Sequence, residues 1–462
     1  MLNQRENDGR DELVPPMDDR VYRASIAAKD RDTLQRVILE AWQLAGTVPE
    51  LGIGALVVQA HYKPRSRARL LVRVEIPRPP PKKRPLVQYL YLQAYPTLAA
   101  ARRRVAQLGK VPLKCVGPAV FLLEEWACVV WALPNGPMLR TTKMMLGRKA
   151  FARFLAEADL APAKGGRDPR PPKLIRYVPR SRALFRYRGP REGERQRLYI
   201  KVYAPGQDLT AAANLAMAGQ AASSAAGTFA VPSLVAHVRR RRALVMREIP
   251  GRRLSEVDPV SESPAFEAAG RALAGLHAST IVPARQWSAR REVVALQAAM
   301  ADIELALPAL TPRLRELLAA IRGHHETLVF PPDRPIHANM FGDQVLVGEA
   351  NVIGIVDWDD LSLGDPLFDL GRLIAHGMFL AQRAREGAAV RVAVVGALLR
   401  GYADGRGSID LERLHWHVAT ALLLRAKISA LRPLPESWLT DVNWCAGIAG
   451  SILEGQRLEG QD

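Results

Sequence analysis

Residues 335–347 read PIHANMFGDQVLV, and residues 353–360 read IGIVDWDD. Each segment contains a short apolar run, VLV in the first and IGIV in the second, with polar residues at its ends. Such runs predict two short strands that pair as a hairpin. The hairpin would bring Gln344 and Asp357 together at one end, where their oxygens could hold a magnesium ion. The alternative is a turn-rich hairpin whose acidic side chains are simply solvated.

The sequence on either side of this hairpin predicts a two-lobed protein. Apolar residues recur at helical spacing over residues 266–279, 314–321 and 411–431. The chain before residue 256 is instead rich in strand-like runs. A small sheet followed by a helical lobe is an α+β arrangement. A cleft between two lobes is a favoured place for a ligand.

Several motifs resemble those of the aminoglycoside phosphotransferase and choline kinase superfamily, which has the protein-kinase fold. That family's catalytic loop reads His-x-Asp, four residues and then Asn or Gln, and it resembles the segment from His337 to Gln344. The family's metal-binding strand, Ile-Asp-Trp, resembles Val356-Asp357-Trp358. The resemblance covers roughly residues 174–432 and looks most like the maltokinase-type branch. Further matches are YIKVY at 199–203, MREIPG at 246–251, LAGLH at 273–277 and GDPLFDL at 364–370.

The resemblance implies an ATP-dependent kinase that uses Mg²⁺ and transfers the γ-phosphate to a hydroxyl group of a small molecule, such as a sugar. Phosphoryl transfer depends mainly on holding the phosphates and neutralising their charge, so a lysine and metal ligands suit it. The partners implied are therefore a nucleotide and a small hydroxyl acceptor. The resemblance assigns nucleotide binding to Lys201, Arg247, Glu248 and Ile249, metal binding to Gln344 and Asp357, and the catalytic loop to His337 and Asn339.

Asn339 departs from the family pattern at the position of the catalytic base. A neutral amide can accept a hydrogen bond from a hydroxyl group but cannot take its proton. General-base assistance contributes about 10² to 10⁴ in rate, so a slow enzyme is compatible with this residue. The helix expected after Lys201 also contains no acidic residue over 209–226, which leaves the ion-pair partner of this lysine open. The alternative is therefore a pseudokinase that binds a nucleotide or a protein partner without efficient catalysis.

An internal duplication is predicted from four matches in the same order. YKPRSRA at 62–68 resembles YVPRSRA at 177–183, and YLQAY at 91–95 resembles YIKVY at 199–203. The position of Lys201 is Gln93 in the first unit, so that unit is not expected to bind nucleotide phosphates. We expect a cap that resembles a degenerate N-lobe over residues 1–160, a linker over 161–173, an N-lobe over 174–255 and a helical C-lobe over 256–462.

The composition of the 462 residues limits which other classes of protein the chain could belong to. Three separate cysteines do not predict a disulfide framework or a zinc site. The sequence contains no signal-peptide pattern and no apolar run long enough for a membrane span, so a cytoplasmic protein is expected. The formal net charge of +19 admits a nucleic-acid binder as a third class. That third class is disfavoured because no stretch interleaves aromatic and basic residues.

Overall fold

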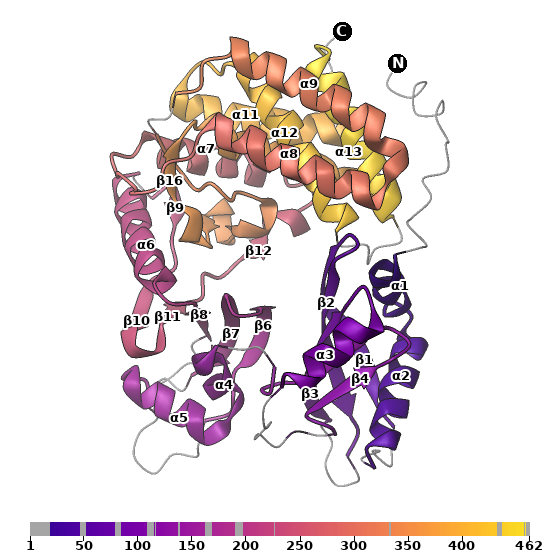
Figure 1. Ribbon diagram of the computed structural model, residues 1–462. Helices are drawn as coiled ribbons and strands as arrows, with labels where there is room; N and C mark the ends of the chain where they lie inside the picture. Colours follow the sequence, from indigo (N-terminus) through magenta and orange to yellow (C-terminus); the bar gives the residue numbers. More distant parts are fainter. Residues whose placement is uncertain are drawn as a thin grey trace.

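The computed structural model describes residues 19–46, 52–78, 85–108, 115, 117–136, 139–161, 169–189, 197–225, 227–331, 334–431, 437–456 and 458. Two five-stranded sheets lie side by side beneath a helical part (Figure 1). The fold is α+β, with a β-rich region followed by a helical one, as predicted. Most of the predicted linker, residues 161–173, lies outside the described residues, and its last residue, Lys173, already begins a strand.

The two five-stranded sheets have the same strand order. In each sheet three strands follow one another, a helix comes next, and the last two strands return so that the fifth pairs with the third. The first sheet has the order β1-β2-β3-β5-β4 and consists of β1 (Gly54–Lys63), β2 (Arg67–Ile76), β3 (Leu86–Ala94), β4 (Val120–Leu123) and β5 (Cys128–Ala132), with α3 (Leu98–Ala106) after β3. The second has the order β6-β7-β8-β11-β10 and consists of β6 (Lys173–Val178), β7 (Arg182–Arg188), β8 (Arg197–Tyr203), β10 (Leu234–Val238) and β11 (Ala243–Arg247), with α6 (Gln207–Ser224) after β8.

The strand register of the two sheets also corresponds. In the first sheet Gln93 lies opposite Arg69 on one neighbouring strand and Val129 on the other. In the second sheet Lys201 has the same position, opposite Leu184 and Leu244. An internal duplication would produce this agreement, and we propose that the two sheets arose from one.

Helices cover one face of each sheet. Helix α1 (Arg20–Ala27) packs against β1 and β2 of the first sheet. Helix α2 (Arg31–Leu44) buries Leu34, Ile38 and Trp42 on the same side. Helix α2 begins at Asp30, whose side chain accepts hydrogen bonds from the first-turn amides. The second sheet packs against α4 (Arg140–Leu146) and α5 (Arg148–Glu157).

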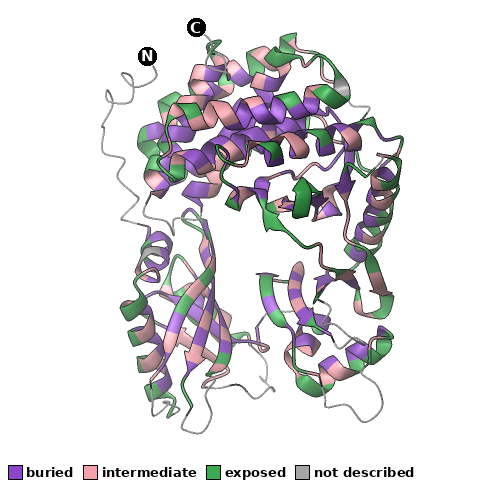
Figure 2. Cartoon of the chain, turned by 180° about the vertical axis from the view of Figure 1, so that it is seen from behind, coloured by how far each residue is buried: buried purple, intermediate pink, exposed green. Residues whose placement is uncertain are grey.

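The helical part encloses the predicted hairpin. Buried residues line the inner sides of its helices (Figure 2). No helix of the described residues is long and apolar enough to cross a membrane. The long helices are α7 (Ser263–Ala278), α8 (Ala289–Ala306), α9 (Thr311–Thr327), α10 (Leu367–Arg383), α11 (Ala388–Arg406), α12 (Leu411–Ala430) and α13 (Trp438–Leu453). The short strands are β9 (Phe229–Ala230), β12 (Arg252–Arg253), β13 (Arg334–Ile336), β14 (Val345–Val347), β15 (Ile353–Ile355) and β16 (Ser362–Gly364), and the 3₁₀ turns are η1 (Arg239–Arg241), η2 (Leu254–Glu256), η3 (Pro308–Leu310), η4 (Gly342–Gln344), η5 (Glu349–Asn351) and η6 (Trp358–Asp360).

Helices α7 and α11 cross so closely that only glycine fits at the crossing. A Cβ atom on Gly401 would lie 1.9 Å from the carbonyl oxygen of Glu267, which is backbone and cannot move aside. We therefore expect Gly401→Ala to lower the free energy of unfolding by about 3 kcal/mol or more, the upper end of overpacking costs. Thermal unfolding of the purified variant measures this effect.

Gly323→Ala is the matched control for this prediction. Gly323 lies on the exposed side of α9, and nothing lies within 4 Å of the place that a Cβ atom would occupy there. Alanine at this position should be neutral or should stabilise the protein by about 0.4–1 kcal/mol. Equal melting temperatures for the two variants would contradict the proposed close crossing.

Candidate active site

Lys201 lies at the centre of the second sheet and is nearly buried. It is on β8, between β7 and β11, and its side chain points away from the face that holds Ile200 and Val202 in the core. The residue is 8% exposed. Its ammonium group pairs with Asp357 and lies 2.7 Å from Oδ2 of Asp359. A buried lysine needs such partners because an unpaired charge away from water is costly.

Asp357 is positioned by the predicted hairpin. Strands β14 and β15 pair in antiparallel register, with Val345 opposite Ile355. The amide of Val356 then donates to the carbonyl oxygen of Gln344 over 3.0 Å. The backbones of Gln344 and Asp357 therefore meet at one end of the hairpin. Asp357 has a φ of 69°, a strained backbone conformation that is found preferentially at functional sites.

The charge of Lys201 keeps Asp357 ionised. Burial alone would raise the pKa of this carboxyl group, but the charge of Lys201 and its hydrogen bond outweigh burial and lower the pKa to about 2. Asp359 accepts a hydrogen bond from Tyr203 over 3.0 Å and pairs with Arg182 over 3.4 Å. The two carboxylates thus tie the second sheet to the helical part.

The structure supplies the partner of Lys201 that the sequence left open. Helix α6 begins at Gln207, two residues before the predicted start, so its first turn includes Asp208, which bonds to His237 over 3.0 Å rather than to the lysine. At Asn214 the helix donates to the carbonyl oxygens of Trp358 and Asp359 over 3.2 and 3.1 Å. An amide therefore positions the segment that carries the carboxylates. The sequence feature that could have indicated Asp359 is the group of three aspartates within residues 357–360, which read DWDD.

Asp369, a buried residue on α10, fixes the predicted catalytic loop by hydrogen bonds to its backbone. Its carboxylate accepts hydrogen bonds from the amides of His337 and Ala338 over 2.6 and 3.0 Å. His337 is fully buried, and its Nε2 lies 3.0 Å from the carbonyl oxygen of Val356. Because a carbonyl oxygen only accepts, Nε2 carries the proton. The histidine thus connects the loop to the strand that bears Asp357 and has a structural place.

Asn339 follows Ala338, whose φ of 61° is again the left-handed conformation. Asn339 itself is half-buried. Among the described residues no group forms a hydrogen bond with its side chain. The strained turn and the Asp369 brace hold this amide in a defined place. Its hydrogen-bonding groups are available to a ligand.

Residues 246–251 join the second sheet to the helical part, and two of their backbone amides make hydrogen bonds within the protein. The amide of Arg247 donates to Ser233, and that of Glu248 donates to Arg197. Neither amide is therefore available to adenine, whereas the amide of Ile249 makes no hydrogen bond with backbone among the described residues. A Cβ on Gly354 would lie 2.6 Å from Cγ2 of Ile249, so this glycine lets the segment rest on β15.

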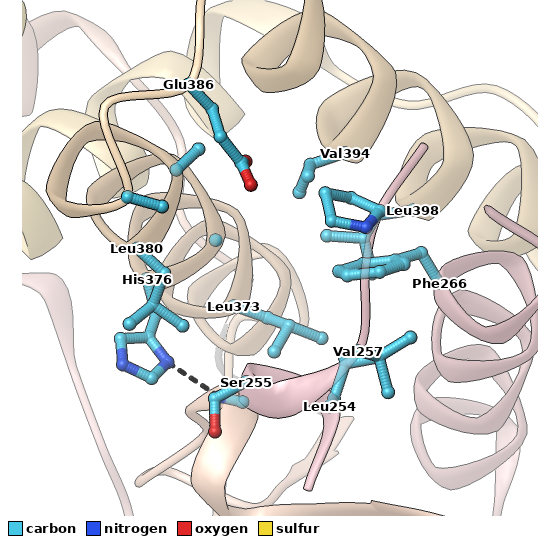
Figure 3. Close-up of a pocket in the computed structure, with 15 residues that line it drawn as sticks. Leu254, Ser255, Val257, Phe266, Leu373, His376, Leu380, Glu386, Val394 and Leu398 are labelled. Carbon is cyan, nitrogen blue, oxygen red and sulfur yellow. Dashed lines mark hydrogen bonds between the residues drawn. The ribbon is translucent and has the colours of Figure 1, made fainter. Parts of the chain in front are cut away.

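A cavity of about 100 Å³ lies between η2, α7, α10 and α11, and Gly342 of the predicted catalytic loop contributes to its wall (Figure 3). Its wall is mostly apolar and includes Phe266, Leu373 and Leu398. His376 reaches its edge and accepts a hydrogen bond from the amide of Gly342 over 2.8 Å. Burial, followed by the charge of Arg425, lowers the pKa of His376 to about 3, so the ring is neutral and can accept this bond at pH 7.

These residues fit a magnesium-bound nucleotide. Asp357 is an ionised carboxylate, and Gln344 offers an amide oxygen at the same end of the hairpin. Magnesium commonly takes one or two such ligands and completes its shell with phosphate oxygens and water. The described residues contain no cluster of three or more His, Cys, Asp or Glu side chains that could hold a metal ion.

The small second sheet carries a buried lysine that pairs with a carboxylate of the helical part. This arrangement is typical of two-lobed, kinase-like phosphotransferases. Residues 179–416 match the Phosphotransferase enzyme family. This match spans just over half of the chain, and the chain therefore belongs to that family. No protein of curated function matches it.

Several solved structures are similar to about two thirds of this chain. A choline/ethanolamine kinase family protein from Mesorhizobium loti is 20% identical with a TM-score of 0.43, over 66% of this chain and 95% of its own. An AMP-bound spectinomycin phosphotransferase is 13% identical with a TM-score of 0.45, over 67% and 98%. An amicoumacin kinase in complex with AMP-PNP, Ca²⁺ and Ami is 13% identical with a TM-score of 0.48, over 70% and 98%.

Proposed function

We propose that this protein is an ATP-dependent kinase that phosphorylates a hydroxyl group of a small molecule. The observation that supports this most directly is the pairing of Lys201 with Asp357. It joins the predicted phosphate-binding strand to the predicted metal-binding strand, which lies 156 residues later in the chain. Family membership and the sequence motifs point to the same activity.

The chemistry follows from the residues that face one another. Mg-ATP, when bound, supplies the γ-phosphate and the cation that neutralises its developing charge. Lys201 would hold the nucleotide phosphates, and Asp357 with Gln344 would hold the cation. Asn339 would accept a hydrogen bond from the acceptor hydroxyl and orient it, without taking its proton. Asp369 and His337 would keep this loop in place and would not touch the substrate.

The finer assignments are proposals as well. The extra N-terminal region and the motifs favour a maltokinase-like branch with a sugar-like acceptor. We propose a cap over residues 1–160, an N-lobe over 174–255 and a helical C-lobe over 256–462. Asn339 favours a second candidate, a pseudokinase that binds a nucleotide or a protein partner without efficient catalysis. The retained pairing of Lys201 with two carboxylates favours the enzyme.

Calorimetric titration with ATP tests the proposal. We expect the full chain to bind ATP with millimolar or tighter affinity in the presence of Mg²⁺ and at least tenfold more weakly with excess EDTA, because the cation links Asp357 to the phosphates. Hydrolysis should depend on Mg²⁺ in the same way. The absence of any binding at millimolar Mg-ATP would overturn the kinase and leave only a pseudokinase that binds a protein partner.

A further inference from the structure

Asp359 holds two basic groups of the second sheet next to each other. Its Oδ2 atom lies 2.7 Å from the ammonium group of Lys201 and 3.4 Å from Nη1 of Arg182. Because both distances end on one oxygen atom, the two cations are close neighbours. The Oδ1 atom accepts a hydrogen bond from Tyr203 over 3.0 Å, and the backbone carbonyl accepts one from Asn214 over 3.1 Å. The carboxylate is therefore fixed, and it fixes the spacing of the two cations.

Arg182 and Lys201 project from the same face of the second sheet. Arg182 begins β7 and lies opposite Tyr203 on β8. Leu184, two residues later on β7, lies opposite Lys201. Side chains two residues apart on a strand share a face, and the intervening Ala183 belongs to the core on the other face. Arg182 therefore meets the helical part from the same side as the lysine.

Arg182 has hydrogen-bond donors that the protein does not use. Its side chain is 29% exposed, against 10% for that of Lys201. Among the described residues only its Nη1 atom makes a hydrogen bond, which Asp359 accepts. The Nε and Nη2 atoms are left, and neither is a buried atom without a partner. A guanidinium group binds phosphate oxygens through two N–H groups at once, so these donors suit a phosphate.

The charges around Asp359 favour more than one phosphate. Two basic residues, Lys201 and Arg182, face two carboxylates. Under the proposed function Asp357 holds the cation, which leaves Asp359 alone against the two basic groups. The excess positive charge then attracts the phosphates whose charge the site must neutralise.

The order of residues along β8 indicates which phosphates Arg182 contacts. Residues 246–251, to which we assign the base of the nucleotide, leave the sheet beside Leu198. Lys201 follows along β8, and Arg182 lies opposite Tyr203, farther still from that segment. A nucleotide whose base lies at residues 246–251 would therefore extend its phosphates past Lys201 toward Arg182.

We infer that Arg182 is a second phosphate-binding residue, which contacts the terminal phosphates of the nucleotide while Asp359 holds it beside Lys201. This inference rests on the proposed function and deepens it. It makes a nucleoside triphosphate the preferred ligand of the site, ahead of the diphosphate and the monophosphate. It also gives Asp359 a positioning role, because this carboxylate sets the distance between the two cations.

Calorimetry of the full chain with AMP, ADP and ATP, each with Mg²⁺, tests the inference. We expect Arg182→Ala to weaken ATP binding by about tenfold or more and to leave AMP binding within twofold of wild type, because only the longer phosphate chain reaches the guanidinium group. Arg182→Lys should lose less, since it keeps the charge. Arg240→Ala is the control: it removes an exposed arginine from the turn between β10 and β11 of the same sheet and should change neither affinity.

A double variant separates contact with the nucleotide from support of the carboxylate. If Arg182 acted only by neutralising Asp359, its removal would cost nothing more once Asp359→Asn had removed that charge. We expect Arg182→Ala to weaken ATP binding by about tenfold in the Asp359→Asn background as well. Equal ATP affinities of Asp359→Asn and the double variant would overturn the inference, and so would equal losses for AMP and ATP in Arg182→Ala.

This inference and the proposed function fail in different ways. A wild-type chain that binds none of the three nucleotides contradicts the proposed kinase, and this inference with it. A chain that binds ATP, but in which Arg182→Ala behaves like Arg240→Ala, contradicts this inference alone.

Discussion

Asp357→Ala removes Mg-ATP binding and lowers phosphate transfer by at least about 10³-fold, the upper range for removing one preorganised electrostatic contact. The expectation follows from the double role of this carboxylate, which pairs with Lys201 and lies at the end of the hairpin beside Gln344. Alanine would leave the cation with one amide ligand and the lysine with Asp359 alone. Calorimetry with Mg-ATP and a phosphate-transfer assay measure the two losses.

Asp360→Ala is the control for this prediction. Asp360 lies three residues away in the same acidic run, but its side chain faces the surface and pairs with Arg285 over 2.6 Å. We expect its removal to leave nucleotide affinity within twofold of wild type. If Asp357→Ala retained Mg-ATP binding at the wild-type level, the metal assignment of Asp357 would be wrong.

Asn339→Asp raises turnover by at least tenfold, toward the 10² to 10⁴ that general-base assistance supplies. The strained Ala338 and the Asp369 brace already fix this position, so the new carboxylate would replace an amide of nearly the same shape. The gain should appear in kcat, because an amide can already accept the hydroxyl hydrogen bond. The rate of the variant should fall as the pH decreases and the new base becomes protonated.

Asp343→Asn tests whether any change of charge near the loop has the same effect. Asp343 is exposed and accepts a hydrogen bond from Ser255 over 2.6 Å. We expect this variant to show neither a gain in turnover nor a new pH dependence. If Asn339→Asp bound Mg-ATP normally but its rate were unchanged, the pseudokinase would be favoured. The assignment of residue 339 to the position of the catalytic base would then be wrong.

Much of the candidate site was predictable because its residues belong to short, regular segments. The alternation of apolar and polar residues around Lys201 predicts a strand, and the runs beside Gln344 and Asp357 predict a hairpin. The fold class follows from the change from strand-like to helical spacing. The repeated segments at 62–68 and 177–183 likewise predicted two units, and the structure contains two sheets of one strand order.

Contacts between distant residues were not predictable in this way. The sequence left the partner of Lys201 open, and the structure pairs it with Asp357 and Asp359, while Asn214 holds their segment. The helix that carries Asn214 contains no acid over 209–224, so sequence spacing alone indicated a missing ion pair. Which groups meet depended on how the helical part packs against the second sheet.

The sequence by itself determined the local chemistry of this protein: the hairpin, the lysine-bearing strand and the amide in place of a catalytic acid. These follow from side-chain alternation and residue identity within a few positions of one another. Only the tertiary structure decided that Lys201 of the second sheet pairs with Asp357 and Asp359 of the helical part, and that Tyr91 and Tyr177, from different sheets, meet edge to face. The physical reason is that strand register and the packing of one sheet against another depend on the whole core, which no short segment specifies.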